Sequence, residues 1–289
     1  MKQLTTREKI ENGIPIVDSQ RMIKFKEKIS PILLGLSKSK ISYDVICDND
    51  LVRYENVPSI YVVNHSCFQD TPIVCNCIKD KAYILAGKQE LEFLDNIFFR
   101  LYGSIFVDRK DKNDMSLSKD VMEKYIEKGV SLIVFPEATW NLSEELLMLP
   151  MKWGIIDIAK NTGAQIIPIL LKYDKSENQC HVKYYDPILI DEAIDKKEAI
   201  NNIRDMMATD IWNDMLRFEQ LKRTEIDVDY LREKMLSVID EYPKLDFDYE
   251  QSVVFKPYPS PDEVYEPIKK LKLTKDNAFL FNKNNKGMR

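Results

Sequence analysis

Histidine is scarce in this chain, which has only two among 289 residues, His65 and His181. A zinc site needs several histidine or cysteine ligands at defined spacings, and the stretch CNC from Cys75 to Cys77 has the wrong spacing for a zinc knuckle. We therefore expect no metal site. The five cysteines are odd in number and come without a secretory context, which favours reduced thiols in the cytoplasm.

Long hydrophobic runs are also missing from the sequence. Even the apolar stretch 91–107 is interrupted by Glu92, Asp95 and Arg100, so it is too polar to cross a bilayer. The first 13 residues have no apolar central region, and we therefore expect no secretory signal. Any contact with a membrane should be peripheral.

The sequence also lacks an excess of positive charge. The formal net charge is -5, whereas a dedicated nucleic-acid binder carries a basic face that neutralises phosphates. Apolar residues make up 44% of the chain and charged residues 31%, as in a folded globular protein. We expect a folded protein that has no nucleic-acid partner.

Basic residues do gather near the N-terminus. Between residues 21 and 40 the only acid is Glu27, and apolar residues alternate with the basic ones. This pattern is typical of an amphipathic helix that lies on an anionic membrane, but also of an ordinary surface helix that packs on its own core. The basic residues are Arg21, Lys24, Lys26, Lys28, Lys38 and Lys40.

Short apolar stretches alternate with helical ones through the middle of the chain, which predicts an α/β domain with helices on its sheet. We expect helices at about 71–78, 89–102, 117–128 and 153–160, with Gly129 and Gly163 as C-terminal caps. The expected strands are 43–47, 59–64, 82–86, 104–108, 131–135, 165–171 and 181–185.

The composition changes after about residue 191. Residues 193–241 are charged, free of glycine and proline, and helical in pattern, and a proline-rich connector and a polar tail follow them. We predict an amphipathic N-terminal segment at 1–40, an α/β core at 41–190, and a helical appendage with a polar tail at 191–289.

A histidine and an aspartate lie close together in the stretch VVNHSCFQD. His65 comes just past the predicted strand, and Asp70-Thr71-Pro72 resembles a helix start in which Asp70 caps the helix. A carboxylate can also fix the tautomer of an imidazole that serves as a general base. Both interpretations stay open from these residues alone, and Cys67 adds the alternative of a cysteine nucleophile.

Two further stretches place polar groups directly after predicted strands. In GSIFVDRKD the guanidinium of Arg109 lies at a strand end, where the sites of open α/β sheets form and where arginine suits a phosphate or carboxylate. In LIVFPEATWN a buried strand is followed at once by Glu137 and Thr139. Each of these could instead be a solvated turn.

Taken in order, these stretches resemble the signature motifs of the glycerolipid acyltransferase family, typified by lysophosphatidate acyltransferase. The first motif is a histidine followed by four residues and an aspartate. NHSCFQD matches it through Asn64, His65 and Asp70, whereas chloramphenicol-type acyltransferases have three residues between the two.

The remaining motifs follow along the chain, and the resemblance covers residues 59–171. GSIFVDR, FPEATW and AQIIPILL are similar to the second, third and fourth motifs, of which the third is usually Phe-Pro-Glu-Gly-Thr-Arg. The matching residues are Gly103, Phe106, Arg109, Phe135, Pro136, Glu137, Thr139 and Pro168.

The resemblance implies a fold with a central mixed, largely parallel sheet flanked by helices, followed here by the helical appendage. It also implies that His65 is the general base, that Asp70 orients it, and that Arg109 holds the phosphate of the acceptor. The remaining residues that it places in substrate binding are Asn64, Glu137, Ala138 and Thr139.

The implied reaction is direct transfer of a fatty acyl group to the hydroxyl of a lyso-glycerolipid, foremost lysophosphatidate, giving phosphatidate. The donor would be acyl-CoA or acyl-carrier protein, with no other cofactor. The expected partners are this donor, the lyso-lipid acceptor and a membrane surface. We expect a cytoplasmic, peripheral-membrane enzyme.

Three departures from the family pattern bear on the acceptor. Trp140 replaces the usual arginine, Ala138 the usual glycine, and Cys67 a common serine. The tryptophan ring could suit a sugar or an acyl chain. The alternatives are therefore another hydroxyl acceptor, such as a lyso-phospholipid or a glycolipid, a lipid-binding relative without turnover, or a thioesterase that uses water.

Overall fold

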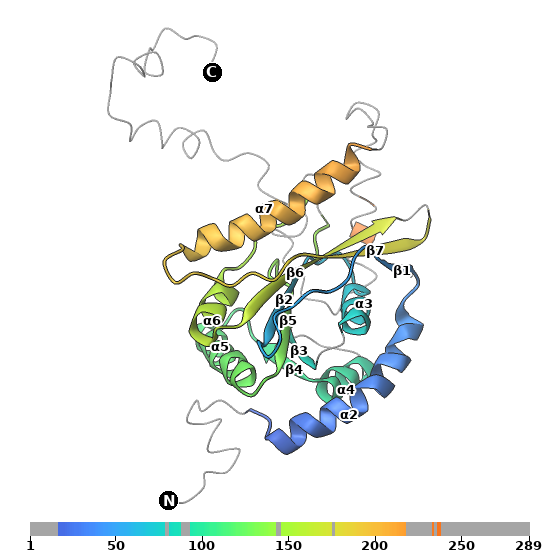
Figure 1. The fold of residues 1–289 in the computed structure, drawn as a ribbon. Coiled ribbons are helices and arrows are strands. Elements are labelled where there is room, and N and C mark those ends of the chain that lie inside the picture. The colour runs from blue at the N-terminus through green and yellow to red at the C-terminus, as the bar shows by residue number, and fades with distance from the viewer. Residues whose placement is uncertain are drawn as a thin grey trace, which may run out of the picture. The chain divides into compact units, whose positions relative to one another are not determined.

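The computed structural model describes residues 17–78, 81–87, 93–142, 146–174, 177–217, 233 and 236–237. The chain divides into two units, Met1–Val253 and Val254–Arg289, and every described residue belongs to the first unit. In this unit, helices flank a central sheet (Figure 1).

The sheet has seven strands within the described residues, in the order β1-β7-β6-β2-β5-β3-β4. Strands β6, β2, β5, β3 and β4 are mutually parallel, while β7 is antiparallel to β6 and pairs in parallel with β1. The strands are β1 Asp44–Cys47, β2 Ser59–Val63, β3 Ala82–Gly87, β4 Ser104–Val107, β5 Ser131–Val134, β6 Gln165–Asp174 and β7 Gln179–Tyr184.

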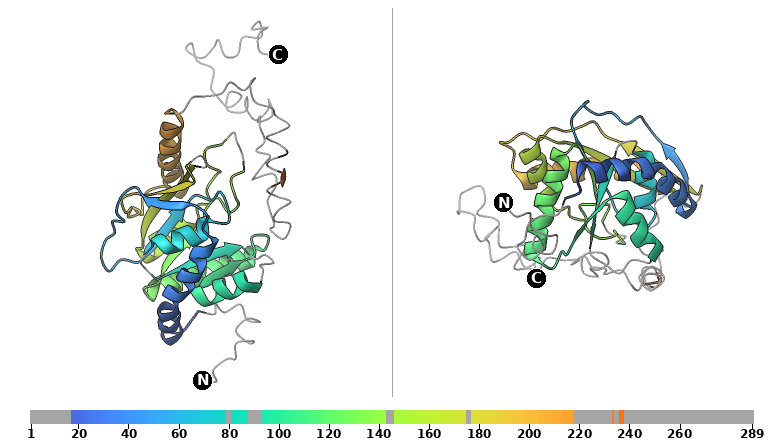
Figure 2. Two further views of the ribbon diagram at one scale, coloured as in Figure 1. Left: turned by 90° about the vertical axis from the view of Figure 1, so that its right-hand side faces the viewer. Right: turned by 90° about the horizontal axis from the view of Figure 1, so that it is seen from below.

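Helices cover both faces of this sheet, as the two views in Figure 2 show. A single turn of 3-10 helix, Lys38–Lys40, follows the first of them. The helices are α2 Gln20–Ser37, α3 Asp70–Cys77, α4 Phe93–Tyr102, α5 Lys112–Glu127, α6 Gly154–Thr162 and α7 Lys196–Met215.

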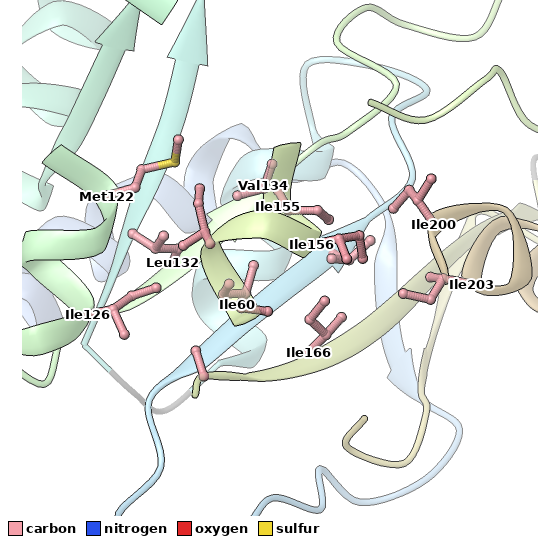
Figure 3. Packing of buried hydrophobic residues seen from close by; sticks show 14 of the residues in the cluster. Ile60, Met122, Ile126, Leu132, Val134, Ile155, Ile156, Ile166, Ile200 and Ile203 are labelled. Atoms are coloured by element: carbon pink, nitrogen blue, oxygen red, sulfur yellow. The ribbon is translucent and has the colours of Figure 1, made fainter. Parts of the chain in front are cut away.

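Alternating residues of β2 build two separate cores, because successive side chains of a strand point to opposite faces. Ile60 and Val62 pack in a cluster with residues of α5, α6 and α7, part of which Figure 3 shows. Tyr61 and Val63 pack in the other cluster, with residues of α3 and α4. All five residues of β2 are buried, and each fully buried isoleucine contributes roughly 2–3 kcal/mol. The strand is therefore a rigid support for the residues that follow it.

The predicted fold class is confirmed, and each expected strand overlaps an observed one. Gly129 and Gly163 both adopt positive φ at helix ends, as a C-terminal cap requires. Helix α5 begins five residues earlier than expected, at Lys112, because the Asp111 side chain caps it by accepting from the amides of Asn113 and Asp114. The polar first turn of this helix lacks the apolar pattern that marked the rest.

The predicted domain division stays a prediction. Helix α7 lies inside the expected helical stretch 193–241, whereas most of 218–289, including the proline-rich connector and the tail, lies outside the described residues. Among the residues that the structure describes, no helix combines the length and the apolar character needed to cross a bilayer.

Candidate active site

The candidate residues gather at one edge of the sheet because β2, β5, β3 and β4 run in parallel. Their carboxyl ends meet at the same edge, which is where sites of open α/β sheets form. His65 follows β2, Glu137 follows β5, and Arg109 follows β4. The strand order therefore brings together residues that are far apart in the sequence.

His65 and Asp70 form a close pair in the turn between β2 and α3. The distance from His65 Nδ1 to Asp70 Oδ2 is 2.8 Å, and the His65 side chain is 18% exposed while that of Asp70 is fully buried. The same Oδ2 accepts hydrogen bonds from the amides of Ser66, at 2.5 Å, and Cys67, at 2.9 Å. The carboxylate thus shapes the turn and holds the imidazole at once.

Of the two interpretations of Asp70 that the sequence left open, the helix cap does not fit the structure. The capping position is Gln69, and Asp70 is the first residue of the helix. Its carboxylate points back to the preceding loop and accepts hydrogen bonds from two backbone amides there. These partly buried amides need an acceptor, and the carboxylate supplies it. Asp70 therefore serves the loop and the imidazole.

A tyrosine supports the second oxygen of Asp70. The hydroxyl of Tyr173, near the end of β6, donates a hydrogen bond to Asp70 Oδ1. Burial, and then the negative charge of Asp70, raise the pKa of Tyr173, so that its hydroxyl keeps its proton and stays a donor. Tyr173 lies 103 residues from Asp70 in the chain, and the sequence had not suggested a role for it.

The other ring nitrogen of His65 is bonded to a tryptophan. Trp140 Nε1 donates to His65 Nε2 at 3.0 Å. An indole N–H can only donate, so His65 Nε2 must be the accepting nitrogen and the ring proton must sit on Nδ1, facing Asp70. This is the tautomer that a histidine base requires. Phe135 stacks on the imidazole, with 4.3 Å between ring centroids.

Trp140 is itself buried, with 6% of its surface exposed. Its ring meets the imidazole edge-on, with centroids 6.0 Å apart. The expectation that this side chain presents an open stacking surface to a sugar or acyl chain therefore does not fit the structure. Its contact with His65 is the feature that the sequence did not reveal.

Glu137 fixes the backbone of His65. Its Oε1 accepts from the His65 amide at 2.9 Å and its Oε2 from the Leu149 amide at 2.7 Å, while the His65 carbonyl accepts from the Asn141 amide at 2.8 Å. Burial raises the pKa of Glu137 to about 7, against the lowering effect of the two amides. The carboxyl is 1% exposed and acts on the backbone.

Asn64 continues the pairing of β2 with β6 by side-chain bonds. Its amide nitrogen donates to the Leu171 carbonyl at 3.0 Å, and its oxygen accepts from the Leu171 amide at 2.8 Å. The side chain is buried and lies directly before His65. It therefore fixes the direction in which the chain leaves the sheet.

The turn after β5 holds the other two residues that the resemblance placed here. Ala138 has φ of 65°, a left-handed conformation that costs an alanine more than a glycine. Its amide donates to the Phe135 carbonyl at 3.0 Å, which closes the turn. Thr139 is buried beside it. The backbone explains why glycine suits this position.

Arg109 lies at the same edge but farther along. Its guanidinium packs on Gly87 at the end of β3, where an added Cβ would meet Arg109 Nη2 at 2.5 Å. Three strand spacings separate β2 from β4, which is roughly 14 Å. The structure thus brings His65, Asp70 and Glu137 into one bonded cluster, and Arg109 is exposed on the rim.

Cys67 has the wrong properties for a nucleophile. Burial and then the charge of Asp70 raise the pKa of its thiol to about 12, and Sγ donates to Asp70 Oδ1 at 3.6 Å. The reactive form of cysteine is the thiolate, which this environment disfavours. Within the part of the chain that the structure describes, no three side chains of His, Cys, Asp or Glu gather as metal ligands would.

Comparisons with known proteins found similar sequences and a similar fold. Residues 44–172 match the family model described as Acyltransferase. The crystal structure of the 1-acyl-sn-glycerophosphate (LPA) acyltransferase PlsC from Thermotoga maritima has the same fold, with a TM-score of 0.54 at 16% identity over 68% of this chain and 83% of that one.

The α/β core is similar to glycerolipid acyltransferases in sequence and in fold.

Curated relatives of this family are similar at modest identity. The 1-acyl-sn-glycerol-3-phosphate acyltransferase of Cocos nucifera is 29% identical over 173 residues, which are 54% of this chain and 53% of that protein. The enzyme of the same name from Saccharomyces cerevisiae is 27% identical over 55% of this chain and 58% of its own length. The chain therefore spans about half the length of the curated relatives that it matches.

Proposed function

We propose that this chain is an acyltransferase that moves a fatty acyl group from a thioester donor to the hydroxyl of a lyso-glycerolipid, with lysophosphatidate as the acceptor. The observation that carries the proposal is the His65–Asp70 pair, in which Asp70 accepts from Nδ1 and leaves Nε2 as the basic nitrogen. The names of the two eukaryotic relatives support the choice of acceptor.

In the proposed reaction His65 Nε2 takes the proton of the acceptor hydroxyl while its oxygen attacks the thioester carbonyl. Asp70 stabilises the imidazolium that forms, because a buried carboxylate lies 2.8 Å from Nδ1. The tetrahedral intermediate then collapses, the carbon–sulfur bond breaks, and the thiolate takes the proton from His65. The products are an ester and a free thiol, and no acyl-enzyme is needed.

The other residues of the cluster act through His65. Asn64 and Glu137 are buried and bind backbone groups, so we assign them to positioning the base. We assign the turn at Ala138 and Thr139 to supporting the same side of the site. Arg109, exposed at the rim, is the group that we assign to the phosphate of the acceptor. The donor is acyl-CoA or acyl-carrier protein.

We also propose that the protein works on the cytoplasmic face of a membrane, to which helix α2 binds. Ile32 and Leu36 are each 68% exposed and Phe25 is 51% exposed. The basic residues of the helix lie in its N-terminal half, between positions 21 and 28, and Lys38 and Lys40 directly follow it. Apolar side chains that enter the interface, together with charges that attract anionic lipid, are what such binding needs.

The test is an acyl-transfer assay read by mass spectrometry on the purified protein. A long-chain acyl-CoA and the corresponding acyl-carrier protein are each offered with lysophosphatidate, other lyso-phospholipids and lyso-glycolipids. We expect phosphatidate from lysophosphatidate, and a reduced yield for acceptors that lack a terminal phosphate. Free fatty acid alone would support a thioesterase, and binding of lipid without any product would support a lipid-binding relative.

A further inference from the structure

The hydrogen bond between Trp140 and His65 conflicts with the reaction proposed above. The acceptor hydroxyl must donate its proton to His65 Nε2, and the indole N–H already donates to that atom at 3.0 Å. An imidazole nitrogen has a single lone pair in the ring plane, so it accepts one strong hydrogen bond. The indole and the acceptor hydroxyl therefore compete for the same position.

The surroundings of Trp140 make this competition selective. The indole is buried at 6% exposed, and the residues on both sides of it in the chain are fixed: Glu137 bonds two backbone amides, and the Asn141 amide donates to the His65 carbonyl. The ring is thus held against the imidazole by the same segment that holds the backbone of His65. Only a group that binds well at the site can displace it.

We propose that Trp140 is a specificity-determining residue that occupies the basic nitrogen of His65 until an acceptor hydroxyl replaces it. The inference rests on the proposed function. The His65 side chain is 18% exposed, so water can reach it, and a base that is free between turnovers would activate that water to hydrolyse the thioester. With the indole in place, water must compete without the binding energy of a lipid acceptor. Trp140 thereby favours transfer over hydrolysis.

A chemical probe reports on Nε2 without any turnover. The nitrogen attacks a carbonyl carbon of diethyl pyrocarbonate, a nitrogen–carbon bond forms, ethyl carbonate leaves and decays to ethanol and carbon dioxide, and the proton on Nδ1 is lost to solvent. Peptide mass spectrometry gives separate rates for His65 and His181, the only two histidines of the chain. His181 serves as the internal reference in every sample.

The deciding variant replaces Trp140 by 3-benzothienylalanine, which has sulfur in place of the N–H and nearly the same size. We expect the His65 rate to rise about three- to tenfold, as loss of one net hydrogen bond implies, with the His181 rate unchanged. The same replacement at Trp153, whose ring faces the Lys196 ammonium at 3.7 Å, is the matched control and should leave both rates unchanged.

A parent-like His65 rate in the benzothienyl protein would overturn the proposal. The Trp140→Phe variant changes the size of the ring as well. A higher His65 rate in this variant alone would show that ring size, through access of the reagent, controls the reactivity of His65 instead of the N–H. Thermal unfolding of each variant checks that the fold persists, and Trp140→Phe supplies the measurement on a natural side chain.

The consequence for catalysis is measured separately. With acyl donor and lysophosphatidate together, we expect the ratio of hydrolysis to transfer to rise at least threefold, or roughly half a decade, in the benzothienyl protein. An unchanged ratio would contradict the specificity role. If the parent transfers no acyl group at all, the proposed function fails while the carbethoxylation rates still decide whether Trp140 occupies Nε2.

Discussion

Three side chains from two segments of the chain hold the imidazole of His65. Asp70 bonds Nδ1 from the start of α3, Trp140 bonds Nε2 from the turn after β5, and Phe135 stacks on the ring. A side chain fixed in this way loses little freedom when a substrate binds, so its geometry is set before the reaction begins. The residues that fix Asp70 in turn should then affect turnover more than binding.

Tyr173 holds Asp70, so its replacement tests whether such a residue affects turnover more than binding. The Tyr173→Phe variant removes the hydroxyl that donates to Asp70 Oδ1, and hydrogen bonds to charged groups are worth about 1.5–3 kcal/mol. We expect kcat to fall at least about tenfold with the KM for the acceptor nearly unchanged. Tyr184→Phe, which removes another buried hydroxyl, is the control and should keep the parent kcat. A higher KM at constant kcat would contradict the positioning role.

The raised pKa of Glu137 implies that the stability of the protein depends on pH. Its pKa is about 7 in the folded state against an ordinary value near 4.5, so between these values the folded chain holds more protons than the unfolded one. The free energy of unfolding therefore falls as pH rises through this window, by up to about 3 kcal/mol. Glu137→Gln removes the titration, because an amide stays neutral.

The measurement is urea unfolding of both proteins at several pH values. We expect the stability of the parent relative to Glu137→Gln to decrease from pH about 4.5 to about 7 and to level off above it. Contributions of titrating groups that do not interact with Glu137 cancel in this difference. A difference that is constant with pH would show that Glu137 titrates normally.

Replacement of Ala138 by glycine should stabilise the protein. Its φ of 65° strains an alanine, so Ala138→Gly should raise the free energy of unfolding by about 0.5–1 kcal/mol after the entropy cost of glycine is subtracted. Ala159→Gly in the interior of α6 is the control and should lower it by at least about 1 kcal/mol, because a buried methyl group is lost as well. Thermal or urea unfolding measures both, and a loss of stability at position 138 would refute the strain argument.

At the scale of single elements, the turn between β2 and α3 shows what the sequence could not reveal. The spacing of His65 and Asp70 predicted their proximity, and Asp70 was placed correctly at the start of a helix. Its carboxylate nevertheless serves the preceding loop, because local sequence does not say which of several nearby amides a carboxylate will bind. The partners Tyr173 and Trp140 come from 103 and 75 residues away, and no local pattern reports such distances.

Helix α2 carries the prediction about the membrane. Its exposed Ile32 and Leu36 follow a basic N-terminal half, whereas Ile23 is buried, so deletion of the helix would also disturb the core. The double variant Ile32→Glu/Leu36→Glu changes only exposed positions and should reduce sedimentation with anionic liposomes at least about tenfold. Leu189→Glu, at 58% exposed, is the control at another apolar surface position. Equal sedimentation of all three proteins would rule out this helix as the binding element.

At the scale of the whole molecule, the fold was the part most open to prediction. Strands rich in isoleucine and valine that alternate with helices suffice to predict an α/β sheet, since each strand has to bury both faces. The order of strands is set by long-range packing, and it is this order that places Glu137 beside His65 and leaves Arg109 three strands away. Residue types and family motifs drew attention to these residues, and the topology shows which of them contact His65 and which do not.

The most direct test of the account compares His65→Ala with the parent in the transfer assay. A general base contributes about 10²–10⁴-fold, so we expect the rate of phosphatidate formation to fall by at least about a hundredfold while the thermal unfolding midpoint stays near that of the parent. His181→Ala is the matched control, because His181 also pairs with an aspartate, Asp48, at 2.8 Å, and it should keep full activity. Transfer by His65→Ala at the parent rate would contradict the assignment of His65 as the general base.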